Sequence, residues 1–198
     1  MPVNDDSKVH PWISKGSRII SENRIFTLKT ETFTSPKTGL DHDFYLLEAG
    51  DWANIIPLTK DREVLLVKQF RHGTNRMSLE IPGGMVDPGE TPEQAGAREL
   101  IEETGYKGSE IIPLGRVEPN PALFNNYCHT YLAKDVIPVA PGAPTKLDGT
   151  EDIELVKVNL DQIPGLIAQE KIVHALVIAA FYHYFMTYAP TQGGKKNV

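Results

Sequence analysis

The sequence predicts an α/β protein in which helices cover a mixed β-sheet, preceded by a β-rich N-terminal portion. Strand patterns fill the first third of the chain, one strongly capped helix interrupts them, and two helical stretches close it. The chain has 198 residues, of which 40% are hydrophobic and 23% charged, as in an ordinary globular protein with a sizeable core. We expect a β-rich portion over residues 1–50, a main domain over 51–190 and a flexible tail over 191–198.

Strands are expected where apolar and polar residues alternate or short apolar runs end in turn residues. Residues 24–35 alternate and are rich in Thr and Phe, and the turn signal Ser-Pro-Lys-Thr-Gly follows at 35–39. Further strands are predicted over residues 42–48, 52–58, 63–70, 79–84, 110–117, 127–133 and 152–158.

The central helix has clear start and stop signals. Thr91 is a good N-cap, Pro92 suits the first helical position, and Gln94 completes a capping box. Gly105 is expected to end the helix as its C-cap. Two more helical stretches are predicted over residues 160–169 and 173–188.

Composition excludes several classes of protein. The net charge of −6, from 20 basic and 26 acidic residues, argues against a nucleic-acid binder, although a small anionic ligand is allowed where the local charge is reversed. The single cysteine, Cys128, excludes an internal disulfide framework and a cysteine-rich zinc site. The apolar stretch 172–189 is interpreted as a buried or dimer-facing helix rather than a membrane span, and residues 1–12 do not resemble a signal peptide. A cytoplasmic location is therefore expected.

The most informative segment is the capped helix. At 100° per residue its side chains divide between an apolar face and an acidic face. The apolar face is predicted to contain Ala97, Leu100, Ile101 and Thr104, and the acidic face Glu99, Glu102 and Glu103. A solvated acidic surface is the simplest interpretation. However, Arg98 can orient these carboxylates, and the backbone at Gly83-Gly84 can offer a carbonyl oxygen. Carboxylate, carbonyl and water oxygens are the ligands that Mg²⁺ and Mn²⁺ prefer.

The segment resembles the Nudix box at its full spacing. The matching residues are Gly84, Glu90, Arg98-Glu99-Leu100, Glu102-Glu103 and Gly105. Tyr106 is the one departure, because an aliphatic residue is usual there. The resemblance implies the Nudix fold, an α/β/α sandwich, and metal-dependent hydrolysis of a nucleoside diphosphate linked to another group.

The same resemblance implies roles for the box residues. Glu99 and Glu103 would be metal ligands, Glu102 a direct or water-mediated ligand, and the carbonyl of Gly83 a further one. Arg98 and Glu102 would belong to the catalytic machinery, and Glu90 would support the cluster. Mg²⁺ is the expected cofactor, with Mn²⁺ as a substitute.

The sequences that flank the box resemble the ADP-ribose pyrophosphatase and nucleoside-diphosphate-sugar hydrolase branch of the family. In that branch the arginine at position 71 touches substrate phosphate or ribose, the glutamate at position 80 helps to build the site, and Pro121 matches a marker proline. An ordinary loop is the alternative interpretation of Pro121. The branch is typically homodimeric through its N-terminal strands, which would make residues 1–50 a dimerisation portion.

The general base is expected in the acidic loop that follows the box. Glu151 is the first choice, and Asp148, Asp152 and Glu154 are alternatives; a solvated loop acid is the simpler interpretation of each. The sequence thus predicts a Mg²⁺-dependent pyrophosphohydrolase that cleaves ADP-ribose or a related nucleoside diphosphate sugar to a nucleoside monophosphate and a sugar phosphate. The alternatives are a non-catalytic nucleotide sensor and an RNA 5′-end pyrophosphohydrolase. Neither nucleic acid nor membrane is an expected partner.

Overall fold

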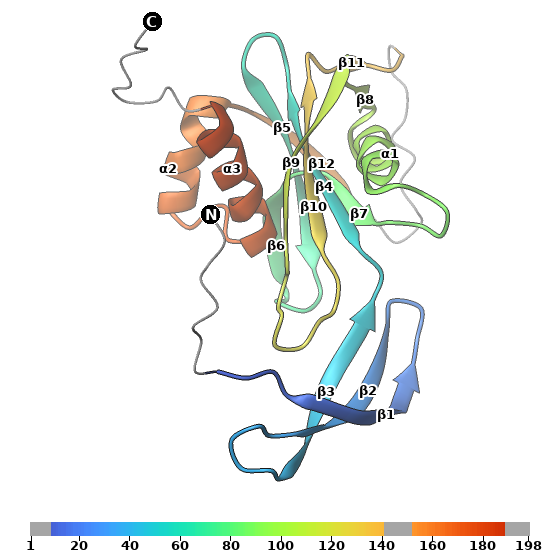
Figure 1. Ribbon diagram of the computed structural model, residues 1–198. Coiled ribbons are helices and arrows are strands. Elements are labelled where there is room, and N and C mark those ends of the chain that lie inside the picture. Colours follow the sequence, from blue (N-terminus) through green and yellow to red (C-terminus); the bar gives the residue numbers. More distant parts are fainter. Residues whose placement is uncertain (1–8, 141–151, 189–198) are drawn as a thin grey trace, which may run out of the picture. The chain divides into compact units, whose positions relative to one another are not determined.

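The computed structural model describes residues 9–140 and 152–188, which form two compact units (Figure 1). The first unit contains residues 9–50 together with Asn120–Asn126. The second unit starts at Asp51 and contains the rest of the described chain.

The first unit is a three-stranded antiparallel sheet. Its strands are β1 (Ile13–Glu22), β2 (Phe26–Thr34) and β3 (Asp41–Ala49), in that order across the sheet. β2 and β3 confirm two predicted strands, whereas β1 was not predicted. All ten residues of β1 are exposed, so its sequence carries no alternation between a buried and a solvated face.

The second unit is built on a seven-stranded mixed sheet. The strand order is β12-β5-β4-β10-β9, while β6 pairs with β5 and β7 pairs with β4. The strands are β4 (Trp52–Leu58), β5 (Glu63–Arg71), β6 (Arg76–Glu80), β7 (Gly83–Met85), β9 (Glu110–Val117), β10 (Cys128–Lys134) and β12 (Ile153–Asn159). β4 and β10 run parallel and the other pairs antiparallel, which confirms the predicted mixed sheet. Two short strands, β8 (Tyr106–Lys107) and β11 (Ile137–Pro138), pair separately.

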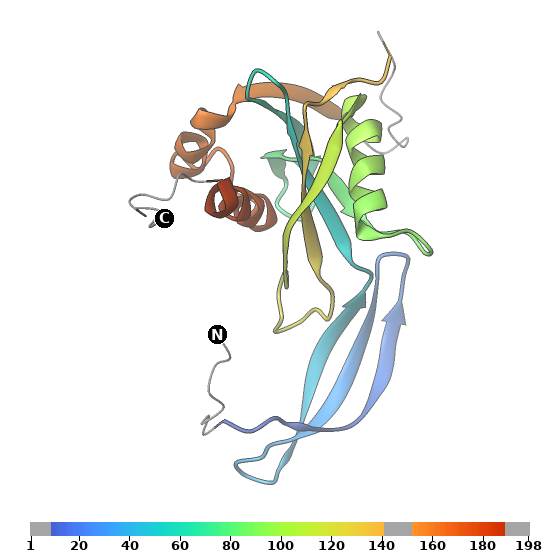
Figure 2. The same cartoon turned by 45° about the horizontal axis from the view of Figure 1, so that its top comes forward.

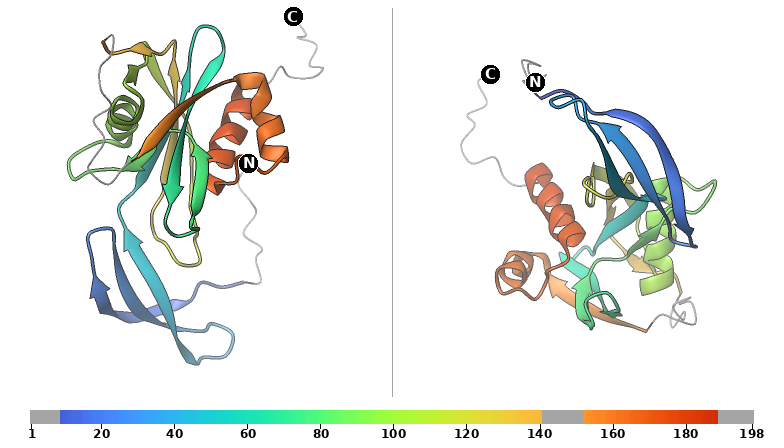
Figure 3. Two further views of the ribbon diagram at one scale, coloured as in Figure 1. Left: turned by 180° about the vertical axis from the view of Figure 1, so that it is seen from behind. Right: turned by 90° about the horizontal axis from the view of Figure 1, so that it is seen from below.

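Helices cover both faces of this sheet, as an α/β/α sandwich requires. α1 (Pro92–Thr104) lies on one face, and α2 (Ile163–Ala168) and α3 (Ala175–Tyr188) lie on the other, with the 3₁₀ turn η1 (Leu160–Gln162) before α2. The same layering is visible in Figure 2 and, from behind, in the left panel of Figure 3.

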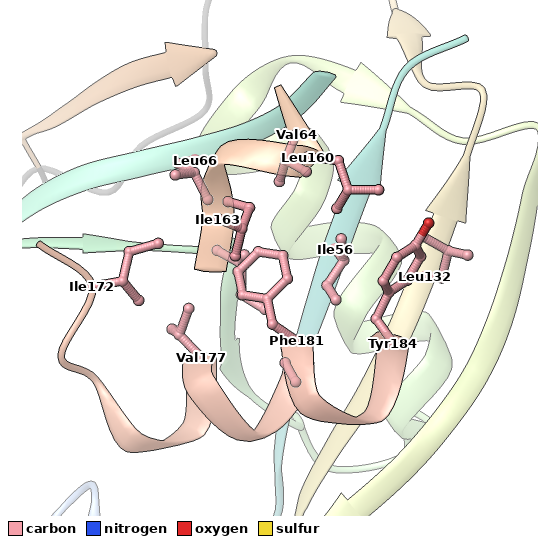
Figure 4. Packing of buried hydrophobic residues seen from close by; sticks show 12 residues of the cluster. Ile56, Val64, Leu66, Leu132, Leu160, Ile163, Ile172, Val177, Phe181 and Tyr184 are labelled. Atoms are coloured by element: carbon pink, nitrogen blue, oxygen red, sulfur yellow. The ribbon is translucent and has the colours of Figure 1, made fainter. Parts of the chain in front are cut away.

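Each face of the sheet has its own apolar core. Under α2 and α3, the fully buried Phe181 packs among side chains of the sheet and of the helices (Figure 4). Under α1, Leu100 packs with Ile55, Leu65 and Tyr131. Cys128 is buried between strands, and burial raises the pKa of its thiol to about 12, which makes it a small apolar group rather than a reactive one.

The ends of α1 match the sequence prediction. The Thr91 hydroxyl accepts a hydrogen bond from the Gln94 amide, and the Gln94 side chain accepts one from the Thr91 amide. Gly105 adopts a left-handed conformation with φ of 72°, which ends the helix. Both caps fix where α1 begins and ends over the sheet.

The sheet is divided beside α1. β4 and β5 pair only at Leu58 and Val64, and β6 and β7 occupy the space where the two strands separate. The link between β6 and β7 is anchored by the carbonyl of Pro82, which accepts a hydrogen bond from the Ile55 amide. Gly83 follows, and a Cβ at this position would lie 2.6 Å from the carbonyl oxygen of Ala53, so the close approach of β7 to β4 requires glycine.

No helix in the described part of the chain is long and apolar enough to cross a bilayer.

Candidate active site

Arg98 is the centre of the polar cluster on α1. Its Nη1 donates to Glu99 Oε1 at 2.7 Å and to Glu102 Oε2 at 3.0 Å. Its Nε and Nη2 donate to the two carboxylate oxygens of Glu90 at 3.0 and 3.1 Å, and Nη2 also donates to the Met85 carbonyl at 3.0 Å. One guanidinium therefore orients three carboxylates at once.

The charges of this network reinforce one another. The hydrogen bond from Arg98 holds the pKa of Glu90 below its ordinary value, with the Asp87 amide adding to the effect. The bond to Glu90, followed by those to Glu99 and Glu102, raises the pKa of Arg98 above its ordinary value. Arg98 and Glu90 are thus both charged at neutral pH.

The carboxylate of Glu99 lies directly over Gly84. A Cβ built on Gly84 would lie 2.2 Å from Glu99 Oε1, whereas real Cβ atoms never approach so closely. Because Gly84 pairs with Ala53, it lies in the part of the sheet that α1 covers. The glycine therefore makes room for a carboxylate between α1 and β7.

Glu103 is turned inward rather than toward solvent. It is only 4% exposed, and its Oε2 accepts a hydrogen bond of 3.1 Å from the Gly83 amide. The predicted division of α1 into two faces is wrong at this position, and also at Ile101, which is 38% exposed. The reason is the Gly83 amide, which supplies a hydrogen bond that lets a carboxylate replace an apolar group on the packed side.

Arg71 and Glu80 form a second polar pair on the same face of the sheet. Arg71 donates from Nε to Glu80 Oε1 at 2.8 Å and from Nη2 to Glu80 Oε2 at 2.7 Å, a bidentate geometry. Glu80 pairs across the strands with Val67, so it faces the same side as Arg71. Burial raises the pKa of Glu80, but the bonds from Arg71 outweigh it and the net pKa is lowered. Glu80 thus holds Arg71 in place as a carboxylate.

The donors on α1 fit a hard divalent cation. Carboxylates of Glu99, Glu102 and Glu103 project from one end of the helix beside the backbone of Gly83. Within residues 9–140 and 152–188, no three acidic, histidine or cysteine side chains already converge as a metal cage. Their oxygens are instead directed to the Arg98 guanidinium and the Gly83 amide, so a positive charge already occupies the cluster.

Of four other predicted residues, two fall in the described part of the chain. Glu151 and Asp148 lie outside the described residues. Glu154 forms an ion pair of 2.8 Å with Lys68. Side chains alternate along β12, and Glu154 lies on the face of the sheet opposite α1. Pro121 belongs to the first unit, where it lines a pocket with Lys29, Leu46 and Phe124.

Two contacts of the second unit were missed from the sequence. The Nε2 of His129 lies 2.9 Å from Asp51 Oδ2, a partner that the sequence did not indicate. Burial raises the pKa of Asp51, but the hydrogen bonds from the Tyr127 amide and His129 outweigh this effect, so the net pKa is lowered. The ammonium of Lys157 lies 5.3 Å from the centre of the Tyr106 ring. The partners of the first pair are 78 positions apart in the sequence and those of the second pair 51, so local sequence patterns could not predict either contact.

Comparison with known proteins gives consistent results. A curated relative, the ADP-ribose pyrophosphatase of Bacillus subtilis (strain 168), is 29% identical over 121 residues, which cover 61% of this chain and 64% of that protein. The ADP-sugar pyrophosphatase of Mus musculus is 35% identical over 122 residues, covering 56% of each chain. The ADP-ribose pyrophosphatase of Saccharomyces cerevisiae (strain ATCC 204508 / S288c) is 37% identical over 107 residues, which cover 53% of this chain and 46% of that protein. The chain thus spans between about half and two thirds of the length of these relatives.

A solved structure supports the fold. The crystal structure of an ADP compounds hydrolase matches 92% of this chain and 98% of its own with a TM-score of 0.78, at 19% sequence identity. The model of the NUDIX domain family matches residues 51–181, a range that contains α1, Arg71, Glu80 and the whole of the sheet. The chain therefore belongs to the NUDIX family.

Proposed function

We propose that this protein is a Mg²⁺-dependent pyrophosphohydrolase that cleaves ADP-ribose or a related nucleoside diphosphate sugar. The products would be a nucleoside monophosphate and a sugar phosphate. One observation carries the proposal: the three glutamates at the end of α1 are gathered around Arg98 and Gly83 beside the paired Arg71 and Glu80. The names of the relatives from Bacillus subtilis and mouse support this choice of substrate class.

Each group has a part in this reaction. Glu99, Glu102 and Glu103, with the carbonyl of Gly83, would hold Mg²⁺, while Arg98 and Glu90 keep the carboxylates oriented. Arg71, fixed by Glu80, would donate to substrate phosphate or ribose. The chemistry that bound Mg²⁺ supplies is neutralisation of the diphosphate and polarisation of phosphorus. Because the chain has a net charge of −6, this neutralisation would offset the long-range repulsion of an anionic substrate.

Hydrolysis also needs a base. Water attacks one phosphorus, its proton passes to the base, and the bond from that phosphorus to the bridging oxygen breaks. Glu151 is the proposed base because it belongs to the acidic segment that precedes β12 in the sequence. Glu154, an alternative acid with a described side-chain contact, is bound to Lys68.

Replacing Glu151 by glutamine is expected to lower kcat by about a hundredfold and to change KM little, because the amide cannot take the proton from water. Steady-state kinetics with ADP-ribose and Mg²⁺ measure both constants. Glu154→Gln serves as the matched control and should retain wild-type kcat. An unchanged kcat in Glu151→Gln would assign the base to another acid.

The substrate class is tested with a panel of ADP-ribose, ADP-glucose and UDP-glucose, with Mg²⁺ and after its removal by EDTA. We expect a nucleoside monophosphate and a sugar phosphate as products, and no product with EDTA. Thermal stabilisation by a nucleotide without any product would instead indicate a sensor. Cleavage confined to triphosphorylated RNA would indicate action on RNA ends. Either outcome would refute the proposal.

We also propose that the protein is a homodimer that uses its first unit. This unit exposes large apolar side chains, including Trp12 at 43% and Phe44 at 41%, and exposed apolar patches often mark protein–protein interfaces. Light scattering on the purified protein should give twice the chain mass of 22.0 kDa. A mass of one chain at micromolar concentration would exclude this dimer.

A further inference from the structure

We propose that Lys157, supported by Tyr106, is a specificity-determining residue that contacts the group attached beyond the diphosphate and favours a negatively charged group there. This inference rests on the proposed function, because it concerns the substrate of the same site. Four features of the second unit lead to it.

First, Lys157 lies on the face of the sheet that carries α1. It pairs with Leu65, which packs in the core under α1. Its neighbours Val156 and Val158 pack instead against the core under α3. α1 itself packs mainly over β4, β7 and β10, so β12 at the outer edge of the sheet is not covered by the helix. Accordingly, Leu155 on the same face is 36% exposed.

Second, the ammonium is held next to the end of the acidic helix. It lies 5.3 Å from the centre of the Tyr106 ring, at a distance typical of a cation–π contact. Tyr106 directly follows the left-handed Gly105 that ends α1, and it comes three residues after Glu103. The Nudix box usually has an aliphatic residue at this position, which offers no ring face to a cation. The aromatic ring that distinguishes Tyr106 from the usual residue of the box is therefore the group that contacts Lys157.

Third, Lys157 and Arg71 lie at opposite ends of the proposed site. Leu65, the partner of Lys157, and Arg71 are six residues apart on β5, a span of roughly 20 Å. Gly83 pairs with Asn54, which comes four residues before Leu58 on β4. Because Leu58 pairs with Val64 in an antiparallel arrangement, Gly83 lies level with Lys68 of β5, about midway along this span. An extended nucleoside diphosphate sugar has a similar length. With its diphosphate at the carboxylates and its nucleoside toward Arg71, its second group reaches Lys157.

Fourth, the charge of Lys157 is not neutralised within residues 9–140 and 152–188. The strand residues Lys68 and Lys134 form ion pairs there with Glu154 and Glu110, whereas Lys157 has only the ring of Tyr106. An ammonium is a compact charge that favours phosphate and carboxylate oxygens. In a chain of net charge −6, this cation beside the catalytic helix therefore suits an anionic group on the substrate.

The test compares ADP-ribose with its analogue that carries a further phosphate at the 1″ position. The two compounds differ only in this phosphate, which adds negative charge to the second group. We expect the wild-type protein with Mg²⁺ to prefer the phosphorylated analogue by about tenfold in kcat/KM. Lys157→Met should abolish this preference, chiefly through KM, whereas Lys157→Arg should retain most of it. The ratio of the two kcat/KM values is independent of how much of each variant is folded.

Control variants separate the charge from the ring that supports it. Lys134→Met makes the same substitution on another strand and should leave the preference unchanged. Tyr106→Phe keeps the ring and should retain the preference, while Tyr106→Leu should weaken it. In the Lys157→Met background, Tyr106→Leu should have no further effect on the ratio.

Two outcomes would overturn the inference. If the wild type lacks the preference, or if Lys157→Met keeps it, Lys157 does not contact the second group, while hydrolysis of ADP-ribose still supports the proposed function. If the wild type hydrolyses neither compound, the proposed function fails and the inference fails with it.

Discussion

Glutamine in place of Glu103 should abolish hydrolysis, with kcat falling by about a thousandfold. Glu103 is almost fully buried and accepts a hydrogen bond from the Gly83 amide, so its carboxylate is held beside the proposed metal position. The amide of glutamine keeps the volume and one oxygen, and Gly83 can still donate to it. The substitution therefore removes a charge from the metal site and leaves the packing of α1 largely intact.

The matched control is Glu93→Gln, which removes one negative charge from the exposed first turn of the same helix. It should retain wild-type kcat. Titration calorimetry with Mg²⁺ should show weakened binding only for Glu103→Gln, and thermal denaturation should find both variants folded. Near wild-type turnover in Glu103→Gln would remove Glu103 from the set of metal ligands.

Alanine in place of Gly84 should lower kcat/KM by about a hundredfold, because the new methyl group occupies the position of the Glu99 carboxylate. The nearest atoms to the added Cβ are those of the Glu99 carboxyl group, at 2.2 and 2.6 Å. They form the far end of a flexible side chain, so the side chain can move while the backbone stays. Glu99 would then lose its position between α1 and β7 and its bond to Arg98.

Gly83→Ala and Gly165→Ala serve as comparison variants for Gly84→Ala. At Gly83 the added Cβ would meet the backbone of Ala53 at 2.6 Å, so this variant should lose thermal stability as well as activity. At Gly165 the nearest atom is 4.0 Å away, so activity should be unchanged. Gly84→Ala is expected to show the roughly hundredfold lower kcat/KM with a melting temperature close to that of the wild type. An active Gly84→Ala would show that the Glu99 position is not needed.

Local signals in the sequence were sufficient for α1 and for most strands. The capping box at Thr91 and the glycine at position 105 depend on neighbouring residues alone, and the structure confirms both. β1 was missed because neither of its faces is buried in the described chain. A strand without a buried face does not need apolar and polar residues to alternate. The limits of α1 were therefore predictable, and those of β1 were not.

The sequence could nominate residues for the candidate site but could not predict their geometry. The spacing of the Nudix box identified the acids on α1, yet helical periodicity placed Glu103 on the solvent side with the other two. Its burial depends on the Gly83 amide, and thus on how β7 pairs with β4. The contact of Lys157 with Tyr106 likewise depends on the register of β12 against β5. Pairing between strands that are distant in sequence cannot be predicted from a single local segment.

Arg98 supplies a positive charge to the acidic cluster from within the chain itself. Four acidic side chains lie within one loop and helix, and their mutual repulsion would oppose a compact fold without a nearby cation. Arg98 provides that cation from within the chain, in contact with Glu90, Glu99 and Glu102. In zinc fingers, by contrast, folding requires the ion itself. If the proposed site binds Mg²⁺, we therefore expect loss of the ion to stop hydrolysis but to leave the protein folded.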